Sequence, residues 1–324
     1  MLSFKGFLIE ALSSDTKGKL HELLVGYHLN GEKHMEKHDN AEGESPEEAH
    51  DRLKKSVTPE DYKEANDRAK FAANDIKKNI TGPIHKIQWT SKAGDIHRAT
   101  GIHASQTQDA SDIVVTTRHP DTGEELHHGI SLKVSDNHGE VPVSNPGMES
   151  THGGRAILDA HREGLKKDFP EIMNQSNPKA RNAAMTDNPG AAAEIKRRNS
   201  GMLNNLATHL HSQLSSMSGE DLAKHIREHV LKANPTPMQQ QGHVHMKHTT
   251  TGMSGDYRSS SSDPSKDYED KLNDTENLKA ERKGTSVIFT HKGVPFAKHR
   301  MKLSTGSDPM SSVKGSGETI KSKK

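Results

Sequence analysis

The chain has 324 residues, of which 29% are hydrophobic, 3% aromatic and 27% charged, and its 45 basic side chains nearly balance its 44 acidic ones. No apolar run approaches the roughly 18 residues of a membrane span, so the sequence argues against a transmembrane protein. The lack of cysteine excludes disulfide scaffolds, thiolate zinc sites and cysteine nucleophiles. A low apolar content without a large net charge predicts a modest folded core that carries long solvated segments.

The first part of the chain is predicted to be helical. Residues 2–12 place aromatic and aliphatic side chains on one helical face, and a second short helix is expected over residues 20–29. Two further helix starts are marked by Ser45-Pro46-Glu47-Glu48 and Thr58-Pro59-Glu60-Asp61, in which a capping residue precedes proline and acidic residues. The later helix ends at Gly82-Pro83.

Strand-like patterns then replace the helical spacing. Strands are predicted at residues 84–89, 112–117 and 129–135. The last two are joined by His119-Pro120-Asp121-Thr122-Gly123, a strong turn sequence, so they should pair as an antiparallel hairpin. Helical spacing returns over residues 154–169 and 191–233.

The richest set of chemical groups falls on the predicted hairpin. Asp112 opens one strand, and Ser131 and Lys133 lie two residues apart on its partner, so strand alternation puts these two on one face. If that face also carries Asp112, a carboxylate, a hydroxyl and an ammonium meet at one sheet end. A carboxylate there can hold Mg²⁺, which needs only one or two protein carboxylates. The lysine can orient or help deprotonate an attacking water and offset charge on a pentacoordinate phosphorane.

At these residues the sequence resembles the PD-(D/E)xK nuclease superfamily. Its members place Asp on one strand and Glu-x-Lys on the next, and an upstream helix often adds a Glu. The resemblance implies that Asp112, Lys133 and Ser131 are the catalytic positions and that Mg²⁺ (or Mn²⁺) is the cofactor. Ser131 departs from the usual Glu or Gln, although some restriction-enzyme branches read Ser-x-Lys there, and the departure removes one metal ligand.

The resemblance also implies a second acidic ligand. Gly18-Lys19-Leu20-His21-Glu22 looks like the helical Gly-x-x-x-Glu of the family, which makes Glu22 a metal ligand beside Asp112. Glu64, on the helix before the first strand, is the weaker candidate. The implied fold is α/β: a restriction-endonuclease-like mixed sheet flanked by helices, with a helical insertion and a partly disordered C-terminal segment. The helix–three strands–helix–strand core of the family maps onto residues 17–169, and its last strand would come from residues 286–290.

The N-terminus carries a second resemblance. Residues 1–11 are similar to the capsid-targeting peptide of the internal head proteins of T4-like bacteriophages, which a prohead protease cuts after a Leu/Ile-x-Glu triplet. Leu8-Ile9-Glu10 supplies that triplet and Ala11 follows, so the implied cut lies between Glu10 and Ala11. A short amphipathic helix can dock on a prohead scaffold by its apolar anchors. The alternative is that the same side chains pack on the protein's own core.

Two weaker candidates remain. His243 and His245 could share a face with His248 nearby, and three imidazoles can bind Zn²⁺. Exposed surface histidines are the alternative, because the segment is polar and offers no rigid frame. Residues 145–147 (Asn-Pro-Gly) read as a turn that would bring Ser144 and Asn145 near Lys133, where they would contact substrate.

The leading prediction is a phage-encoded, metal-dependent nuclease that hydrolyses DNA phosphodiester bonds. The alternative is a catalytically inactive, DNA-associated or virion structural (internal head) protein with the same fold. The expected partners are DNA and a prohead scaffold or protease, with no membrane, and the expected location is the virion interior, the host cytoplasm or both. The expected divisions are a targeting peptide at 1–12, a nuclease-like core at 13–175, a helical insertion at 176–235, a mobile linker at 236–284, a hairpin at 285–303 that completes the core sheet, and a disordered tail at 304–324.

Overall fold

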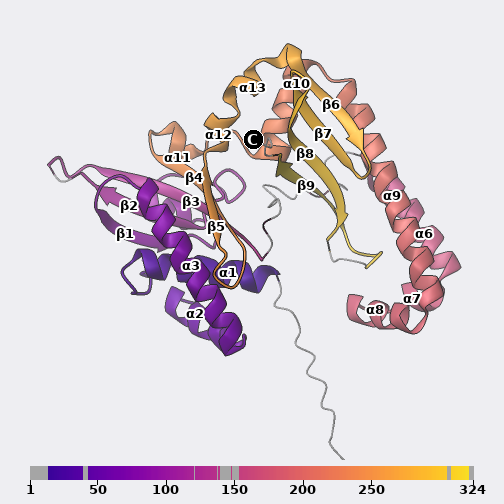
Figure 1. Ribbon diagram of the computed structural model, residues 1–324, viewed down its shortest axis with the longest axis horizontal. Helices are drawn as coiled ribbons and strands as arrows, with labels where there is room; N and C mark the ends of the chain where they lie inside the picture. Colours follow the sequence, from indigo (N-terminus) through magenta and orange to yellow (C-terminus); the bar gives the residue numbers. More distant parts are fainter. Residues whose placement is uncertain are drawn as a thin grey trace, which may run out of the picture. The chain divides into compact units, whose positions relative to one another are not determined.

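The computed structural model describes residues 14–38, 43–119, 121–136, 138, 147, 153–304 and 308–320. The chain is a mixed α/β protein with two sheets, one in each of two compact units (Figure 1). Unit 1 consists of Met1–Gly139 and Pro235–Asp263, and unit 2 consists of Glu140–Asn234 and Pro264–Lys324. The predicted core at 13–175 is therefore too long, because the chain leaves the first unit after its third strand and returns only at residue 235.

Three helices open unit 1, and the starts of the second and third follow from capping chemistry. They are α1 (Ser14–Leu29), α2 (Pro46–Lys55) and α3 (Pro59–Asn79). Ser45 and Glu48 form a capping box at α2, and Thr58 accepts a hydrogen bond from the Asp61 N–H at α3, which confirms both predicted starts. Helix α1 begins six residues before the predicted position, because Ser and Asp are well suited to a first helical turn.

The sheet of unit 1 has the order β1-β2-β3-β4-β5. The first three strands form an antiparallel meander, β4 runs parallel to β3, and β5 runs antiparallel to β4. The predicted strand positions and the predicted hairpin are confirmed. The strands are β1 (Ile84–Trp89), β2 (Ile113–Arg118), β3 (Glu125–Ser135), β4 (Val244–Thr251) and β5 (Arg258–Ser262), and the short helices α4 (Asp95–Thr100) and α11 (Pro237–Gln240) belong to the same unit.

The two faces of this sheet differ in chemistry. On one face, Ile113 and Ile130 lie opposite each other and join a core cluster with side chains of α1 and α3 such as Leu24 and Ile76. Because side chains alternate along a strand, the neighbouring positions point to the other face. That face carries a small apolar cluster that includes Val114, together with the polar positions of β3 and β4.

The segment predicted to be a mobile linker, 236–284, instead supplies two strands of the first sheet. Strand β4 pairs along its whole length with β3, which makes it a central strand. Central parallel strands usually read as continuous apolar runs, whereas β4 buries Lys247, His248 and Thr250. Its three consecutive threonines favour strand geometry, but a polar sequence of this kind does not predict a strand in the middle of a sheet.

Unit 2 contains the predicted helical insertion and a second sheet. The long helix α9 (Pro189–Ser215) packs its buried stripe, which includes Leu206 and Leu210, against a cluster that also holds Phe289 of the sheet. The remaining helical elements are α6 (Arg155–Asp168), α7 (Pro170–Met173), α8 (Pro178–Asp187), α10 (Gly219–His225), a π-helix (Ile226–Leu231), α12 (Pro264–Asp267), α13 (Glu269–Asn273) and a 3₁₀ turn (Thr275–Asn277). The sheet is antiparallel throughout and comprises β6 (Leu278–Lys283), β7 (Ser286–His291), β8 (Val294–Leu303) and β9 (Val313–Thr319), in that order.

Two predictions about the C-terminal part are wrong. The hairpin at 285–303 forms as β7 and β8, but these strands join the second sheet and do not complete the first. The tail at 304–324 was expected to be disordered, yet β9 within it pairs with β8. This strand has few apolar side chains. It is held instead by backbone pairing with β8 and by the ion pairs of Glu318 with Lys298 and Arg300.

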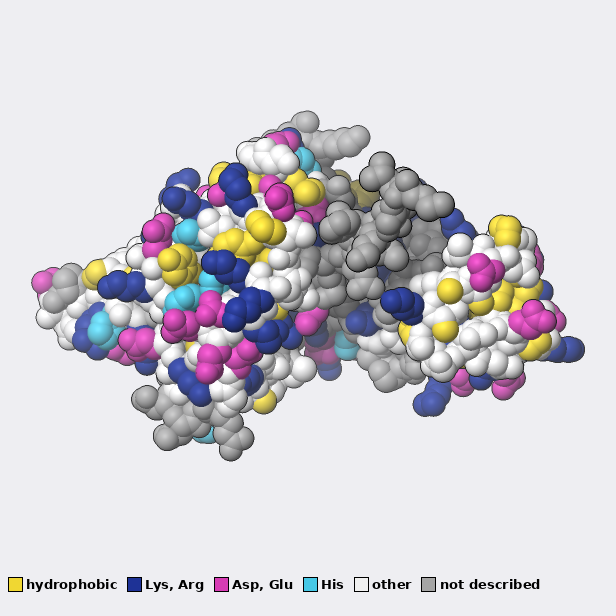
Figure 2. Space-filling view, turned by 90° about the horizontal axis from the view of Figure 1, so that it is seen from below, with side chains coloured by type: hydrophobic (Ala, Val, Ile, Leu, Met, Phe, Trp, Pro, Cys, Tyr) yellow, Lys and Arg dark blue, Asp and Glu magenta, His cyan; other side chains and the backbone are white. Residues whose placement is uncertain are grey.

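Two features of the described residues bear on membranes and nucleic acids: the length and apolarity of the helices, and the distribution of charge on the face that Figure 2 views. Among the helices of the described residues, none is long and apolar enough to cross a bilayer. Figure 2 shows basic and acidic side chains interspersed on the face that it views, in line with the near-balance of charges in the sequence. Any affinity for a nucleic acid must therefore come from a local arrangement of charges.

Candidate active site

Asp112 lies at one end of the first sheet, immediately before β2. Its N–H donates to the Ile130 carbonyl at 2.9 Å, and its carbonyl accepts from the Thr90 N–H at 3.0 Å. The backbone is therefore held between the neighbouring strands β1 and β3. Its side-chain Oδ2 accepts a hydrogen bond from the Leu132 N–H at 2.6 Å, which fixes the carboxylate over the partner strand.

Lys133 approaches the same carboxylate from β3. Its Nζ lies 3.5 Å from Asp112 Oδ2, and the two side chains keep 32% and 23% of their surface exposed. The Lys133 ammonium and the Leu132 N–H both favour the charged form of Asp112, but burial dominates and raises the pKa of this carboxyl. The structure thus brings together Asp112 and Lys133, two of the residues singled out from the sequence.

Glu22 reaches the same place from α1. Its Oε2 accepts a hydrogen bond from the Trp89 Nε1–H at 3.0 Å. Burial, followed by repulsion from Asp112, raises the pKa of Glu22 to about 8, against opposing contributions from Trp89 and Lys133. Two carboxyl groups and one ammonium from three separate elements therefore act on one another at this end of the sheet.

The middle of the polar face carries a serine and a second lysine. Ser131 is 5% exposed and lies in register with Lys247 of β4, which is 8% exposed. Burial, with a smaller contribution from Lys133, lowers the pKa of the Lys247 ammonium to about 7. Ser131 therefore has Lys247 as its neighbour on β4 and Lys133 two residues further along β3, and it contributes no carboxylate to the site.

His245 lies two residues before Lys247 on β4 and therefore on the same face of the sheet. His245 Nε2 lies 4.0 Å from Asp109 Oδ1. Asp109 is fixed by hydrogen bonds from the Ser111 N–H at 3.1 Å and the Ser111 hydroxyl at 2.6 Å. Burial lowers the pKa of His245, and Asp109 partly opposes this effect.

The other histidines of this segment do not join a common site. His243 precedes β4 and lies against His127, with ring centroids 4.6 Å apart. His248 is buried on the opposite face from His245, where its Nδ1 is 3.0 Å from the Ser261 hydroxyl. The structure therefore does not assemble a zinc site from His243, His245 and His248.

The remaining predicted residues lie apart from the site or cannot be placed. Glu64 of α3 accepts hydrogen bonds from the Ser254 N–H and the Tyr257 hydroxyl, and no contact joins it to Asp112. Glu10, Ala11, Ser144 and Asn145 lie outside the described residues.

The donor set suits a hard cation with few protein ligands. Within the described ranges, no group of three or more His, Asp or Glu side chains is arranged to hold a metal ion. Glu22 and Asp112 offer two carboxylates, and Mg²⁺ typically binds through one or two carboxylates while keeping several waters. Glu22 and Asp112 are both half-buried, and a shared cation would offset the repulsion between their carboxylates. The pair fits Mg²⁺ or Mn²⁺ and does not fit the nitrogen-rich and sulfur-rich sites of zinc.

Sequence reasoning missed Trp89 and Lys247 as members of this site. Trp89 ends β1, and its indole contact with Glu22 depends on how α1 docks. Lys247 lies in the segment 236–284, which composition predicts to be a linker. The signal that could have revealed it is the run of threonines after Val244-His245-Met246-Lys247-His248, which is typical of a strand.

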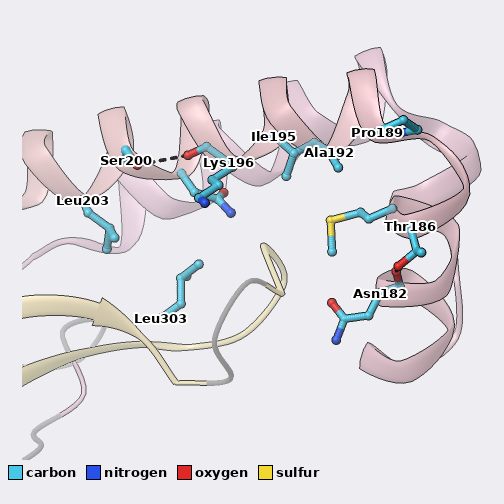
Figure 3. A pocket seen from close by; sticks show the side chains of 11 residues that line it. Asn182, Thr186, Pro189, Ala192, Ile195, Lys196, Ser200, Leu203 and Leu303 are labelled. Carbon is cyan, nitrogen blue, oxygen red and sulfur yellow. Dashed lines mark hydrogen bonds between the residues drawn. The ribbon is translucent and has the colours of Figure 1, made fainter.

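A separate cavity of about 680 Å³ lies in unit 2. Figure 3 shows that it lies between α8, α9 and the end of β8, with Leu303 facing Leu203 and Lys196. The Ser200 hydroxyl at its wall already donates to the Lys196 carbonyl within α9 at 3.1 Å. The lining is mostly apolar and carries one charged side chain, so it offers no acid–base pair comparable to the site in unit 1.

Comparison with known proteins gives no family assignment. No protein-family model matches the chain, and no curated protein matches it either.

Proposed function

We propose that this protein is a metal-dependent nuclease that hydrolyses DNA phosphodiester bonds. The observation that carries the proposal is that Glu22, Asp112 and Lys133 meet at one end of the sheet. Two half-buried carboxyl groups with raised pKa values next to a lysine cost folding stability, and perturbed groups of this kind cluster at functional sites. Carboxylates that can hold a hard cation, together with an ammonium beside them, suit phosphoryl-transfer chemistry best.

The order of the elements supports a restriction-endonuclease-like core for unit 1. Helix α1 precedes the antiparallel strands β1, β2 and β3, and α11 precedes β4, which runs parallel to β3. With α2 and α3 added before β1, α4 between β1 and β2, and α6 to α10 between β3 and α11, this order is consistent with the helix–three strands–helix–strand core of the PD-(D/E)xK superfamily. We propose that β4 is the last strand of that core, in place of residues 286–290, which belong to the other sheet.

In the proposed mechanism, Asp112 and Glu22 would hold Mg²⁺ or Mn²⁺, and the bound ion would activate water and polarise the phosphate. The Leu132 N–H keeps the Asp112 carboxylate in place at 2.6 Å. Lys133, held 3.5 Å from that carboxylate, donates a hydrogen bond to the attacking water or to the phosphate. Its positive charge offsets the negative charge that builds up as the phosphorus becomes pentacoordinate.

A second candidate function is a catalytically inactive, DNA-associated or virion structural protein. Ser131 favours it, because this position contributes no carboxylate and leaves Glu22 and Asp112 as the two acidic groups described at the site. The resemblance of residues 1–11 to a capsid-targeting peptide supports a phage origin and a place in the virion for either candidate, with the prohead scaffold or protease as a partner.

The test is incubation of the purified protein with supercoiled, linear and single-stranded DNA, with Mg²⁺, with Mn²⁺ and with EDTA. We expect metal-dependent cleavage of at least one form, its loss in Lys133→Ala, and wild-type activity in Lys86→Ala, which changes a lysine of β1 that pairs with Thr116, four residues along the chain from Asp112. Binding of DNA without cleavage under every condition would favour the inactive alternative.

A further inference from the structure

Lys247 is a buried cation with no anionic partner in the described structure. It lies in the middle of β4, is 8% exposed, and takes part in no hydrogen bond or ion pair with the described residues. The charged neighbour that acts on it most is Lys133, which repels it. Burying an unpaired ammonium is costly, and the fold gives Lys247 no structural reason to be charged.

The groups around Lys247 are suited to bind an anion. Ser131 lies in register with it on β3 and, among the described residues, has no hydrogen-bond partner for its hydroxyl. Neighbouring strands lie about 4.8 Å apart, and residues two apart on a strand about 6.6 Å. Lys133 therefore lies diagonally across from Lys247 on the same face, and both long side chains can reach one ligand of phosphate size.

We infer that Lys247 and Ser131 bind a phosphate of the nucleic-acid backbone at the site, next to the position on which Lys133 acts. This inference deepens the proposed function and rests on it for the identity of the ligand. A bound phosphate supplies the anionic partner that the fold does not provide and favours the charged form of Lys247, so the effect of this lysine falls on DNA binding. The Ser131 hydroxyl donates a hydrogen bond to a phosphate oxygen, a role that an ionised carboxylate at this position could not fill.

The experiment measures binding of a fluorescein-labelled DNA duplex and a labelled single strand by anisotropy in EDTA, over a range of salt concentrations. We expect Lys247→Met to weaken binding about tenfold at low salt and to reduce the slope of log K against log[salt] by about one, the share of one phosphate contact. Lys86→Met is the matched control on the same sheet, and it should leave both quantities unchanged. Lys247→Arg keeps the charge and should retain most of the affinity.

The outcomes separate this inference from the proposed function. Wild-type cleavage together with wild-type binding by Lys247→Met would overturn the inference and leave the nuclease assignment standing. Lys247-dependent binding by a protein that cleaves nothing would support the inference and overturn the nuclease assignment. Displacement of the labelled DNA by inorganic phosphate, at a phosphate concentration no higher than the DNA concentration needed for half-saturation, would indicate a site for small anions. That result would overturn the choice of DNA as the ligand.

Folding of the variants is checked by thermal unfolding. Lys247→Met removes a buried charge, so we expect a melting temperature equal to or above that of the wild type. If this variant fails to fold, the Lys247→Arg and Ser131→Ala variants decide the matter. Loss of affinity in Lys247→Arg as large as in Lys247→Met would show that side-chain shape, not charge, matters, and would contradict a phosphate contact.

Discussion

Replacement of Glu22 by Gln should change how the stability of unit 1 depends on pH. The native pKa of Glu22 is about 8, against an ordinary value of 4.5, because the carboxyl is buried and lies near Asp112. A raised carboxyl pKa means that the native state holds a proton that the unfolded chain has released. The resulting stabilisation is fully present below about pH 4.5 and is lost as the pH rises to about 8. The variant has no proton to lose and still accepts the Trp89 hydrogen bond.

The expected magnitude follows from these two pKa values. Between about pH 5.5 and about pH 9, the wild type should lose roughly 3 kcal/mol relative to Glu22→Gln, and less where water relaxes around the pair. The assay is urea unfolding in EDTA, followed by the fluorescence of Trp89, the single tryptophan of the chain, which lies in β1 of unit 1. Glu60→Gln on the exposed first turn of α3 is the control.

Because all other groups titrate alike in the two proteins, their contributions cancel in the difference between the two unfolding free energies. A stability difference between wild type and Glu22→Gln that stays the same at both pH values would refute the reasoning, because Glu22 would then titrate as an exposed carboxyl. Addition of Mg²⁺ at the higher pH should stabilise the wild type by about 2.7 kcal/mol when the metal is present at about 100 times its dissociation constant. The variant should respond much less.

The remaining predictions concern three other parts of the chain. Ser131→Glu should keep or tighten Mn²⁺ binding, measured by isothermal titration, if the site is an active nuclease with a weak third ligand; no cleavage by either the wild type or this variant would fit the inactive alternative. Truncation after Ser304 removes β9 and the Glu318 ion pairs, so the melting temperature should fall by several degrees, and an unchanged value would contradict a packed strand. Mature protein in virions should begin at Ala11, and Glu10→Gln should block this cut; mass spectrometry that finds only full-length chain would contradict it.

Local chemistry made much of unit 1 predictable. Capping at Ser45 and Thr58 gave the helix starts, and the turn at 119–123 gave the hairpin. Once that hairpin is known, alternation places Lys133 near Asp112 without further information. Both residues could therefore be paired from the sequence, because their contact depends on short-range geometry.

Long-range pairing could not be predicted in the same way. Strand β4 meets β3 across more than a hundred residues of intervening chain, and its polar sequence gave no sign that it is central. Lys247 joined the site only through that pairing. Strand β9 has Val313 as its main apolar anchor and is held by backbone bonds to β8, so composition alone suggested disorder. In the second sheet, β7 and β8 could be predicted as a hairpin, but the polar outer strands β6 and β9, which pair with them, could not be recognised from composition.

The central claim is that Asp112 and Lys133 form the working centre of a metal-dependent nuclease. The most direct measurement compares plasmid cleavage by wild type, Asp112→Asn and Lys133→Ala over a range of Mn²⁺ concentrations. The account predicts that excess Mn²⁺ partly restores Asp112→Asn, because that change weakens metal binding, and does not restore Lys133→Ala, which lacks the charge that stabilises the transition state. Equal cleavage by wild type and Lys133→Ala at every metal concentration would contradict it.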